Sequence, residues 1–326
     1  MNHKYTALLK KSLVFLSVLF LFITCDKTSQ IEQDIEATEV QVDVIRFDYA
    51  FAKASPENIN DVKNQYPDFF PDRYDDAYWT QKLEDSIQME LREEVLKSFP
   101  VTSERIENDF ESLFKRVSFY FPTKKIPKVY TVTSDVDYNN KIIWAGDKLL
   151  LALDTYLGSD HRFYDSFAAY QTALMRPEFM TVDAAHSFAQ NIVATPRSYS
   201  LLNAMIYEGK KLYVMDKLLS DKSPELKFSY TADELAFAQE NEVFIWQYFI
   251  MKELLYSTDR KLSQRFIDPA PFSKFYLELD SETPGRLGRY IGYQIVASYM
   301  KNNEISMDAM LLQDAQTLFK KSKYKP

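Results

Sequence analysis

A glutamate interrupts the apolar stripe of a long helical pattern in the second half of the chain. The apolar residues of this stripe are Leu201, Met205, Leu212 and Met215, spaced by four or three residues around position 208. That position is Glu208, and a buried carboxylate is unfavourable unless it is neutralised, hydrogen-bonded or bound to a metal ion. The pattern therefore predicts either an ion pair that serves the architecture, with Arg289 as the expected partner, or a metal ligand.

A histidine on the preceding helical pattern is the second candidate for chemistry. His186 lies on the apolar face of residues 180–194, which also carries Val182, Ala189 and Val193. A lone histidine on such a face is more often a core residue than a ligand. The alternative is an unorthodox metal site in which Asp183 and His186 join Glu208.

The residues around Glu208 resemble an element of zinc metallopeptidase-like proteins. Residues 206–213 (IYEGKKLY) are similar to the pattern E-G-x-A-x-Y, whose glutamate is the third metal ligand in those proteins. Their preceding helix carries H-E-x-x-H, which supplies two imidazoles and a general base. The counterpart here is residues 186–190 (HSFAQ), where Ser187 replaces the base and Gln190 the second imidazole. The resemblance implies a zincin-like scaffold with a degenerate site at His186, Glu208 and Arg289, without catalytic residues, metal or cofactor.

The single cysteine of the chain lies where a secretory signal would be cleaved. Basic residues (Lys4, Lys10, Lys11) precede an apolar run over residues 13–23, and polar residues follow Cys25. The run is too short to span a bilayer, which needs roughly 20 apolar residues. We therefore predict a lipoprotein signal peptide over residues 1–24, lipidation of Cys25, a flexible tether over residues 25–38, and one domain over residues 39–326. The membrane is then a partner through acyl chains.

Composition narrows the class of protein. The net charge of −8 disfavours binding to nucleic acid or to anionic lipid surfaces. A lone cysteine allows no internal disulfide. Abundant aromatic residues with only six glycines favour a compact, mostly helical body.

The elements that must position these residues form two groups. Short apolar or β-branched runs at residues 40–47, 129–132, 141–144 and 149–153 predict one small sheet. Helical patterns cover residues 79–99, 103–117, 165–175, 180–194, 199–218, 231–256, 286–301 and 306–321. The fold class is therefore α+β, mostly helical, with a helical C-terminal half.

Glycines indicate where helices pack closely. Gly209 follows Glu208, although glycine in a helix interior is about 1 kcal/mol less favourable than alanine. Gly288 and Gly292 lie one turn apart in the pattern of residues 286–301. We expect another backbone of the same chain to approach these glycines.

Several segments, taken in order, resemble the gliding-motility lipoprotein GldB family of Bacteroidota. They are the lipoprotein start, residues 44–48 (VIRFD), 66–70 (YPDFF), 153–158 (LDTYLG), the helix of Glu208, and residues 284–293 (PGRLGRYIGY). The resemblance implies a cell-envelope lipoprotein of the gliding machinery that is associated with type IX secretion and contacts other envelope proteins. It also implies a non-catalytic scaffold or interaction role, in the outer membrane facing the periplasm. The alternatives are a zinc-dependent hydrolase with unorthodox ligands, and an envelope lipoprotein that binds glycans or peptides through aromatic side chains.

Overall fold

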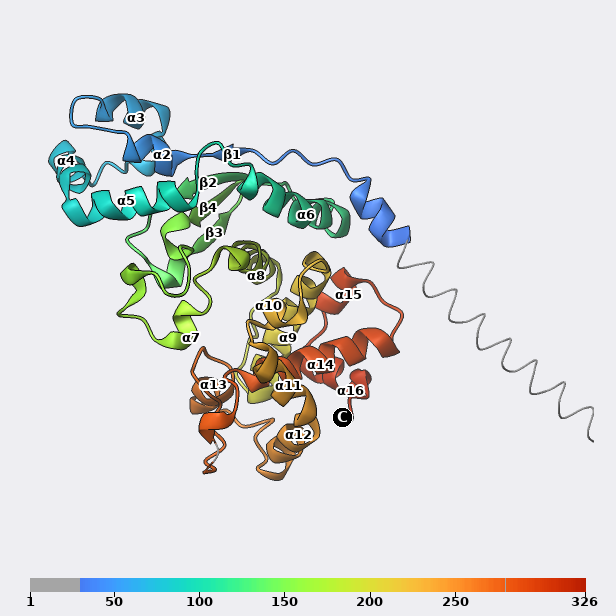
Figure 1. Ribbon diagram of the computed structural model, residues 1–326. Coiled ribbons are helices and arrows are strands. Elements are labelled where there is room, and N and C mark those ends of the chain that lie inside the picture. Colours follow the sequence, from blue (N-terminus) through green and yellow to red (C-terminus); the bar gives the residue numbers. More distant parts are fainter. Residues whose placement is uncertain (1–29, 279) are drawn as a thin grey trace, which may run out of the picture.

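A computed structural model describes residues 30–278 and 280–326 (Figure 1). One four-stranded sheet is formed by β1 (Val44–Ile45), β2 (Lys128–Val132), β3 (Ile142–Ala145) and β4 (Lys148–Ala152). The N-terminal half adds helices α2 (Phe47–Ala52), α3 (Ile59–Gln65), α4 (Asp76–Glu84), α5 (Ser86–Ser98) and α6 (Arg105–Tyr120). Helices then follow from α7 (Ala169–Thr172) through α8 (Met180–Ile192), α9 (Leu201–Leu218), α10 (Pro224–Phe228), α11 (Ala232–Glu240), α12 (Glu242–Met251), α13 (Lys261–Phe266), α14 (Leu287–Asn302) and α15 (Met307–Leu311) to α16 (Ala315–Ser322). The predicted α+β class, with a small sheet and a helical C-terminal half, is confirmed.

The sheet has the strand order β1-β2-β4-β3, and each of the four predicted segments contributes one strand to it. The strand predicted over residues 40–47 is too long, because only Val44–Ile45 pairs and Phe47 already begins α2. Strands β1, β2 and β4 are parallel, whereas β3 pairs antiparallel with β4. Val129 pairs with Leu149, and these residues, together with Leu151, are fully buried on one face. Tyr130 and Leu150 alternate with them and are half-buried on the opposite face. One face of the sheet therefore carries the core.

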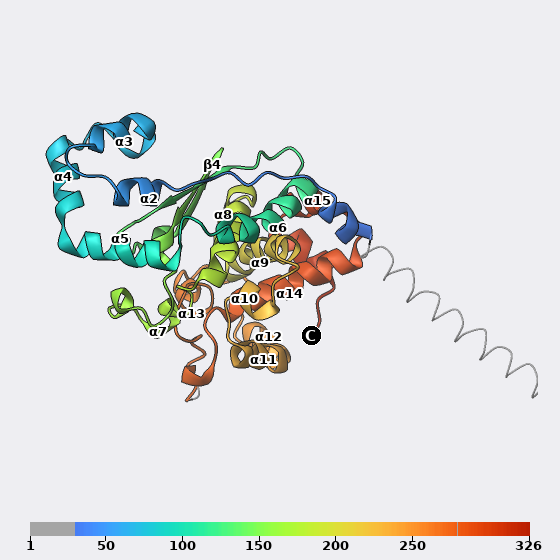
Figure 2. The ribbon, with the colours of Figure 1, turned by 45° about the horizontal axis from the view of Figure 1, so that its top comes forward.

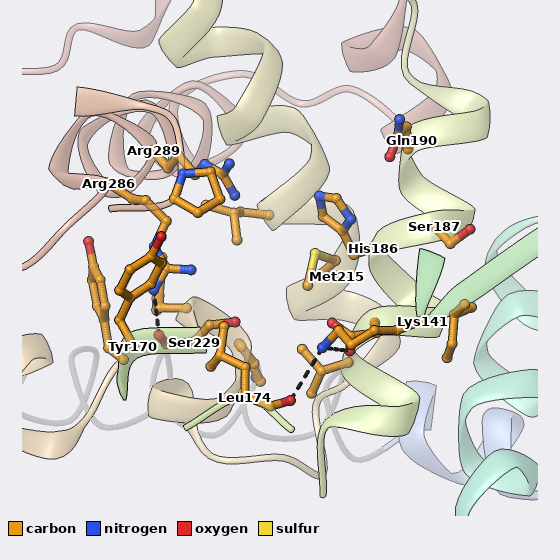
Figure 3. A pocket seen from close by; sticks show the side chains of 18 of the residues that line it. Lys141, Tyr170, Leu174, His186, Ser187, Gln190, Met215, Ser229, Arg286 and Arg289 are labelled. Atoms are coloured by element: carbon orange, nitrogen blue, oxygen red, sulfur yellow. Dashed lines mark hydrogen bonds and ion pairs between the residues drawn. The ribbon is translucent and has the colours of Figure 1, made fainter. Parts of the chain in front are cut away.

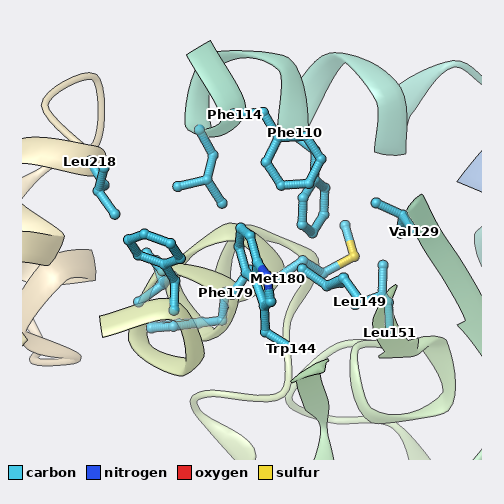
Figure 4. Packing of buried hydrophobic residues seen from close by; sticks show 14 of the residues in the cluster. Phe110, Phe114, Val129, Trp144, Leu149, Leu151, Phe179, Met180 and Leu218 are labelled. Atoms are coloured by element: carbon cyan, nitrogen blue, oxygen red, sulfur yellow. The ribbon is translucent and has the colours of Figure 1, made fainter. Parts of the chain in front are cut away.

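Helices α6 and α8 cover the buried face of the sheet (Figure 4). Trp144 of β3 contacts Phe114 of α6 and Phe188 of α8, with ring centroids 5.7 and 5.0 Å apart. A second core lies among the C-terminal helices, around Phe249 and Phe266. Helix α9 contributes to both cores and joins the two halves.

Helices α9 and α14 cross at two glycines. A Cβ atom on Gly209 would lie 2.2 Å from the carbonyl oxygen of Gly292, and one on Gly292 would lie 1.9 Å from that of Met205. A Cβ atom on Gly288 would lie 2.8 Å from the Phe266 carbonyl oxygen and from Ile267 Cδ1, at the end of α13. The close intramolecular packing expected at these glycines is confirmed.

The helix predicted over residues 79–99 is wrong in one respect, because the chain breaks it at Asp85. The Asp85 carboxylate accepts a hydrogen bond from the Gln88 backbone N–H at 2.9 Å and so begins α5. Ile87, in the first turn of α5, is 61% exposed although it belongs to the apolar pattern. A local N-cap therefore overrides the apolar periodicity here.

Similar breaks divide two other predicted helices. The segment 231–256 becomes α11 and α12, separated at Asn241, and the segment 306–321 becomes α15 and α16, separated before Asp314. Of residues 165–175, only α7 is α-helical. The helices predicted over 180–194, 199–218 and 286–301 are confirmed with ends within two residues of α8, α9 and α14.

The tether predicted over residues 25–38 differs from the structure where the structure describes it. Residues 30–36 are helical and run beside α6 in both views (Figures 1 and 2). Ile35 is 1% exposed, and Glu32 accepts hydrogen bonds from both Nη atoms of Arg116 at 3.2 and 2.8 Å. This part of the segment is docked because an apolar side chain and a bidentate ion pair tie it to the domain. The predicted signal peptide and Cys25 lie outside the described residues.

Candidate functional site

Glu208 lies in the middle of α9 between two cations. Lys211 Nζ lies 2.8 Å from Oε1, and Arg289 Nε of α14 lies 3.6 Å from Oε2. The side chains of Glu208 and Lys211 are 9% and 6% exposed. Burial alone would raise the pKa of Glu208, but Arg289 and Lys211 together hold it below its ordinary value. Glu208 therefore remains ionised inside a buried ion pair.

Sequence reasoning named Arg289 as the partner of Glu208 but missed Lys211. The structure brings Arg289 to the carboxylate, and its Nε also donates a 2.6 Å hydrogen bond to the Ile267 carbonyl. Lys211 stands three residues after Glu208, a spacing that places both side chains on one side of a helix. This three-residue spacing was the feature of the sequence from which Lys211 could have been predicted as a partner of Glu208.

His186 of α8 points into a cavity beside this ion pair (Figure 3). Its Nε2 is buried and has no hydrogen-bond partner among the described residues. Burial lowers the pKa of His186 to about 4, and the nearby charges of Lys211 and Arg289 act in the same direction. The imidazole is therefore neutral at physiological pH.

The neighbours of His186 on α8 do not complete a metallopeptidase motif. Ser187 borders the cavity, but its Oγ is engaged, because it accepts a 3.1 Å hydrogen bond from the Trp144 backbone N–H. Gln190 is exposed at the rim. Neither residue is placed to supply the base or the second imidazole that the motif requires.

Asp183, the remaining ligand of the alternative metal site, is also engaged. Its Oδ2 accepts a 2.8 Å hydrogen bond from the Tyr156 hydroxyl and lies 2.5 Å from Lys141 Nζ. Within residues 30–278 and 280–326, no three His, Cys, Asp or Glu side chains are gathered as a metal site. Because cations already neutralise both carboxylates, Asp183, His186 and Glu208 do not fit a zinc ion.

The segment LDTYLG, noted in the sequence, forms the support behind Asp183. The buried Asp154 carboxylate accepts hydrogen bonds from the backbone N–H groups of Ser134 and Val136 at 2.9 and 2.8 Å. Burial raises the pKa of Asp154 to about 6, against the effect of these hydrogen bonds. Val136 has a φ of 58°, which is strained for a β-branched residue and is held by this contact. Asp154 thus fixes the turn before β3, while Tyr156 fixes Asp183.

A cavity of about 300 Å³ lies where these elements meet. Its walls come from α8, from the turn before β3, from α7, from the segment that follows α10, and from the N-terminal end of α14 (Figure 3). It lies between the two hydrophobic cores, a common location for ligand sites. The sequence predicted His186 and Arg289 at this site but not the cavity itself, because its walls come from distant segments.

The ionisation of His186 leads to a prediction about pH. The unfolded chain protonates this imidazole below pH 6.5, whereas the native protein does so only near pH 4. The unfolded state thus binds more protons between pH 4 and 6.5. The contribution of neutral His186 to the free energy of unfolding is therefore complete above pH 6.5 and is lost as the pH falls toward 4. In the parent protein, His186 should raise the free energy of unfolding by about 3 kcal/mol as the pH increases from 4 to 6.5. We expect His186→Gln to lack this increase, as measured by urea denaturation at several pH values.

The control for this prediction is His161→Gln. His161 lies outside the cavity, with its Nε2 3.5 Å from Glu94. The charged groups that face His186, namely Asp183 of α8, Glu208 and Lys211 of α9 and Arg289 of α14, are the same in both variants. Asp154, whose pKa is raised, makes the free energy of unfolding fall as the pH rises, which is opposite to the effect of His186. This effect of Asp154 is the same in the parent and in both variants, so it cancels in the comparison. A His186→Gln protein that keeps the parental pH slope would contradict the prediction.

Comparison with known proteins gives one result. A family model described as "Gliding motility protein GldB" matches residues 28–326. No curated protein and no solved structure matches the chain. The likeness to a zinc metallopeptidase scaffold stays an inference from the sequence.

Proposed function

The chain belongs to the GldB gliding-motility lipoprotein family, and from this membership we propose that it is a non-catalytic scaffold of the gliding machinery. The observation that carries the proposal is the match over residues 28–326, nearly the whole chain beyond the predicted signal peptide. The ion pairs of Glu208 and Asp183 support a site that has lost metal chemistry. Its role is then to hold other envelope proteins of the machinery in place.

The proposed location is the outer membrane, facing the periplasm, with attachment through lipid on Cys25. Within the described residues, no helix combines the length and the apolar character needed to cross a membrane. A basic start, an apolar run and Cys25 at the predicted cleavage site support lipid attachment instead. Association with type IX secretion is part of the same proposal and follows from the resemblance to the family.

Substitution of the lipidated cysteine tests this proposal. We expect Cys25→Ser to move the protein from the membrane fraction to the soluble fraction, or to leave the signal peptide uncut, and to abolish gliding. The measurement is fractionation of cells followed by immunoblotting, together with an assay of colony spreading. The conservative change Thr28→Ser, three residues further on, is the matched control and should leave both results unchanged. Full membrane retention of a processed Cys25→Ser protein would contradict lipid anchoring.

A zinc-dependent hydrolase is the alternative function, and the ion pairs of Glu208 and Asp183 disfavour it. A metal ion at Glu208 would have to displace Lys211 and Arg289, both of which already neutralise that carboxylate. It would also have to recruit Asp183 away from Lys141 and Tyr156.

Ligand binding through aromatic side chains is favoured by one specific observation. The aromatic residues that line the cavity are Tyr138, Tyr170, Phe228, Tyr230 and Tyr290. Such rings can pack against the ring of a bound sugar or against an apolar side chain. A binding role in this cavity is compatible with a scaffold function. The contacts of the scaffold with other envelope proteins would then depend on the bound ligand.

A further inference from the structure

The cavity is cationic although the protein as a whole is acidic. The basic residues that line it are Lys141, Lys227, Arg286 and Arg289, whereas Asp183 is the single acidic residue of the described lining. The whole chain has a net charge of −8. A local reversal of charge inside a partly enclosed cavity raises the local concentration of anions.

Two of these cations are fully engaged by neighbouring carboxylates. Lys141 Nζ lies 2.5 Å from Asp183, and Lys227 Nζ lies 2.9 Å from Asp216. Each of these two ion pairs is electrically neutral. The excess positive charge of the cavity therefore comes from Arg286 and Arg289, at the N-terminal end of α14.

Arg286 and Arg289 keep hydrogen-bond donors free. Arg286 has no carboxylate within ion-pair distance among the described residues; its Nη2 donates a 2.7 Å hydrogen bond to the Ser229 carbonyl, and its buried Nε has no acceptor. Arg289 uses only Nε toward protein acceptors of the described chain and shares Glu208 with Lys211. Buried donors without acceptors are rare in native proteins and call for an explanation.

A neutral histidine faces the two arginines across the cavity. Figure 3 shows His186 on the wall formed by α8, while Arg286 and Arg289 lie on the wall formed by α14. His186 Nε2 is buried and has no partner within the described residues. The cavity therefore contains polar nitrogen atoms on opposite walls that lack protein partners.

The backbone at the arginine wall is strained. Arg286 has a φ of 61°, and Ser229, whose carbonyl accepts its hydrogen bond, has a φ of 55°. Left-handed conformations at two linked non-glycine residues are unfavourable, and such strain clusters at functional sites. Arg286 is also the N-cap residue of the 16-residue helix α14, where the helix dipole favours an anion.

We propose that this cavity binds a small organic anion whose carboxylate or phosphate group is held by Arg286 and Arg289. Guanidinium groups match the planar geometry of both oxyanions with paired N–H donors. The body of the ligand packs against Tyr138 and Tyr170, which also line the cavity. A volume of about 300 Å³ is at the lower limit of ligand cavities and fits a single sugar ring that carries an acidic group. The inference does not depend on the gliding role.

The test is a titration of the full chain, solubilised in a neutral detergent, with three probes of similar size. Glucuronate carries a carboxylate, glucose 6-phosphate carries a phosphate, and glucose carries no charge. We expect at least one anion to bind with a Kd of about 1 mM or tighter by calorimetry, and glucose not to bind. The anion that binds more tightly identifies the oxyanion. Failure of both anions to bind the folded protein at about 10 mM, or equal binding of glucose, would overturn the proposal.

Two variants assign the binding to this cavity. Arg286→Gln removes a charged donor and should weaken binding of the anion about tenfold or more. Asn139→Asp adds a carboxylate at the exposed rim without a change of size, and should weaken it about fivefold while the fold is kept. Arg176→Gln changes an exposed arginine outside the lining and is the matched control, which should bind as the parent does. Unchanged affinity in Asn139→Asp, or in a folded Arg286→Gln, would overturn the proposal.

Discussion

Gly292→Ala is expected to reduce the free energy of unfolding by roughly 3 kcal/mol or more, or to prevent folding. The added Cβ would lie 1.9 Å from the Met205 carbonyl oxygen and 2.6 Å from its carbon, so the backbones of α9 and α14 would have to separate. Helix propensity acts in the other direction, because alanine is favoured over glycine by about 1 kcal/mol. The clash outweighs this gain since both partners are helix backbone and cannot rotate away. Thermal melting of the full chain, with a fall of about 10 °C or more, measures the effect.

The matched control is Gly146→Ala in the turn between β3 and β4. Gly146 has a φ of 62°, but an added Cβ would meet no atom within 4 Å. Its cost should be limited to the left-handed backbone, about 1–2 kcal/mol. If Gly292→Ala is no more harmful than this control, the close crossing of α9 and α14 is wrong.

The helix crossing shows which parts of the fold can be predicted from the sequence. Apolar periodicity gave the two long helices with accurate ends, and glycine within them indicated close approach, because both features are local. The partners of the approach were not identified, since Gly209 and Gly292 are distant in the sequence. Periodicity failed at Asp85, where a side-chain cap that forms one hydrogen bond determined the end of a helix.

The candidate site was only partly predictable for a related reason. Glu208 stood out because a carboxylate interrupted an apolar stripe, and Arg289 was expected as its partner. The sequence could not show that Arg286 has no carboxylate partner within the described part of the chain, because pairing depends on carboxylates brought near by the tertiary fold. Asp154 follows the apolar run 149–153, and nothing in the local sequence showed that its carboxylate would be buried and hold the turn at Ser134 and Val136.

Glu208→Gln is expected to reduce the free energy of unfolding by about 3–5 kcal/mol. The change leaves Lys211 buried without a carboxylate and removes the charge that faces Arg289. Glutamine keeps some hydrogen bonding, so Glu208→Leu should be worse still. The pair is more than 90% buried at both side chains, so bulk solvent replaces little of the lost interaction. Urea denaturation of the detergent-solubilised chain measures the difference.

A double-mutant cycle separates the pair from its surroundings. Lys211→Met removes the ammonium but keeps the length of the side chain, and alone should destabilise the protein because Glu208 then faces Arg289 only. The double variant of Glu208→Gln with Lys211→Met should be less destabilised than the sum of the single changes by about 2 kcal/mol or more. Arg105→Gln, which breaks the exposed pair with Asp109, should change stability by less than about 1 kcal/mol. Additive effects at Glu208 and Lys211 would contradict a coupled buried pair.

The same double variant distinguishes a structural carboxylate from a catalytic one. If Glu208 serves only to hold α9 against α14 and to neutralise Lys211, a double variant that folds should still support gliding, because no step of chemistry needs the charge. A metal ligand or general base could not be replaced in this way, since an amide neither binds zinc strongly nor accepts a proton at neutral pH. Loss of gliding in a double variant whose stability and membrane attachment match the parent would therefore contradict the non-catalytic proposal. A buried ion pair of purely structural role predicts two results. The double variant retains gliding, whereas Glu208→Gln alone loses gliding because the protein is unstable.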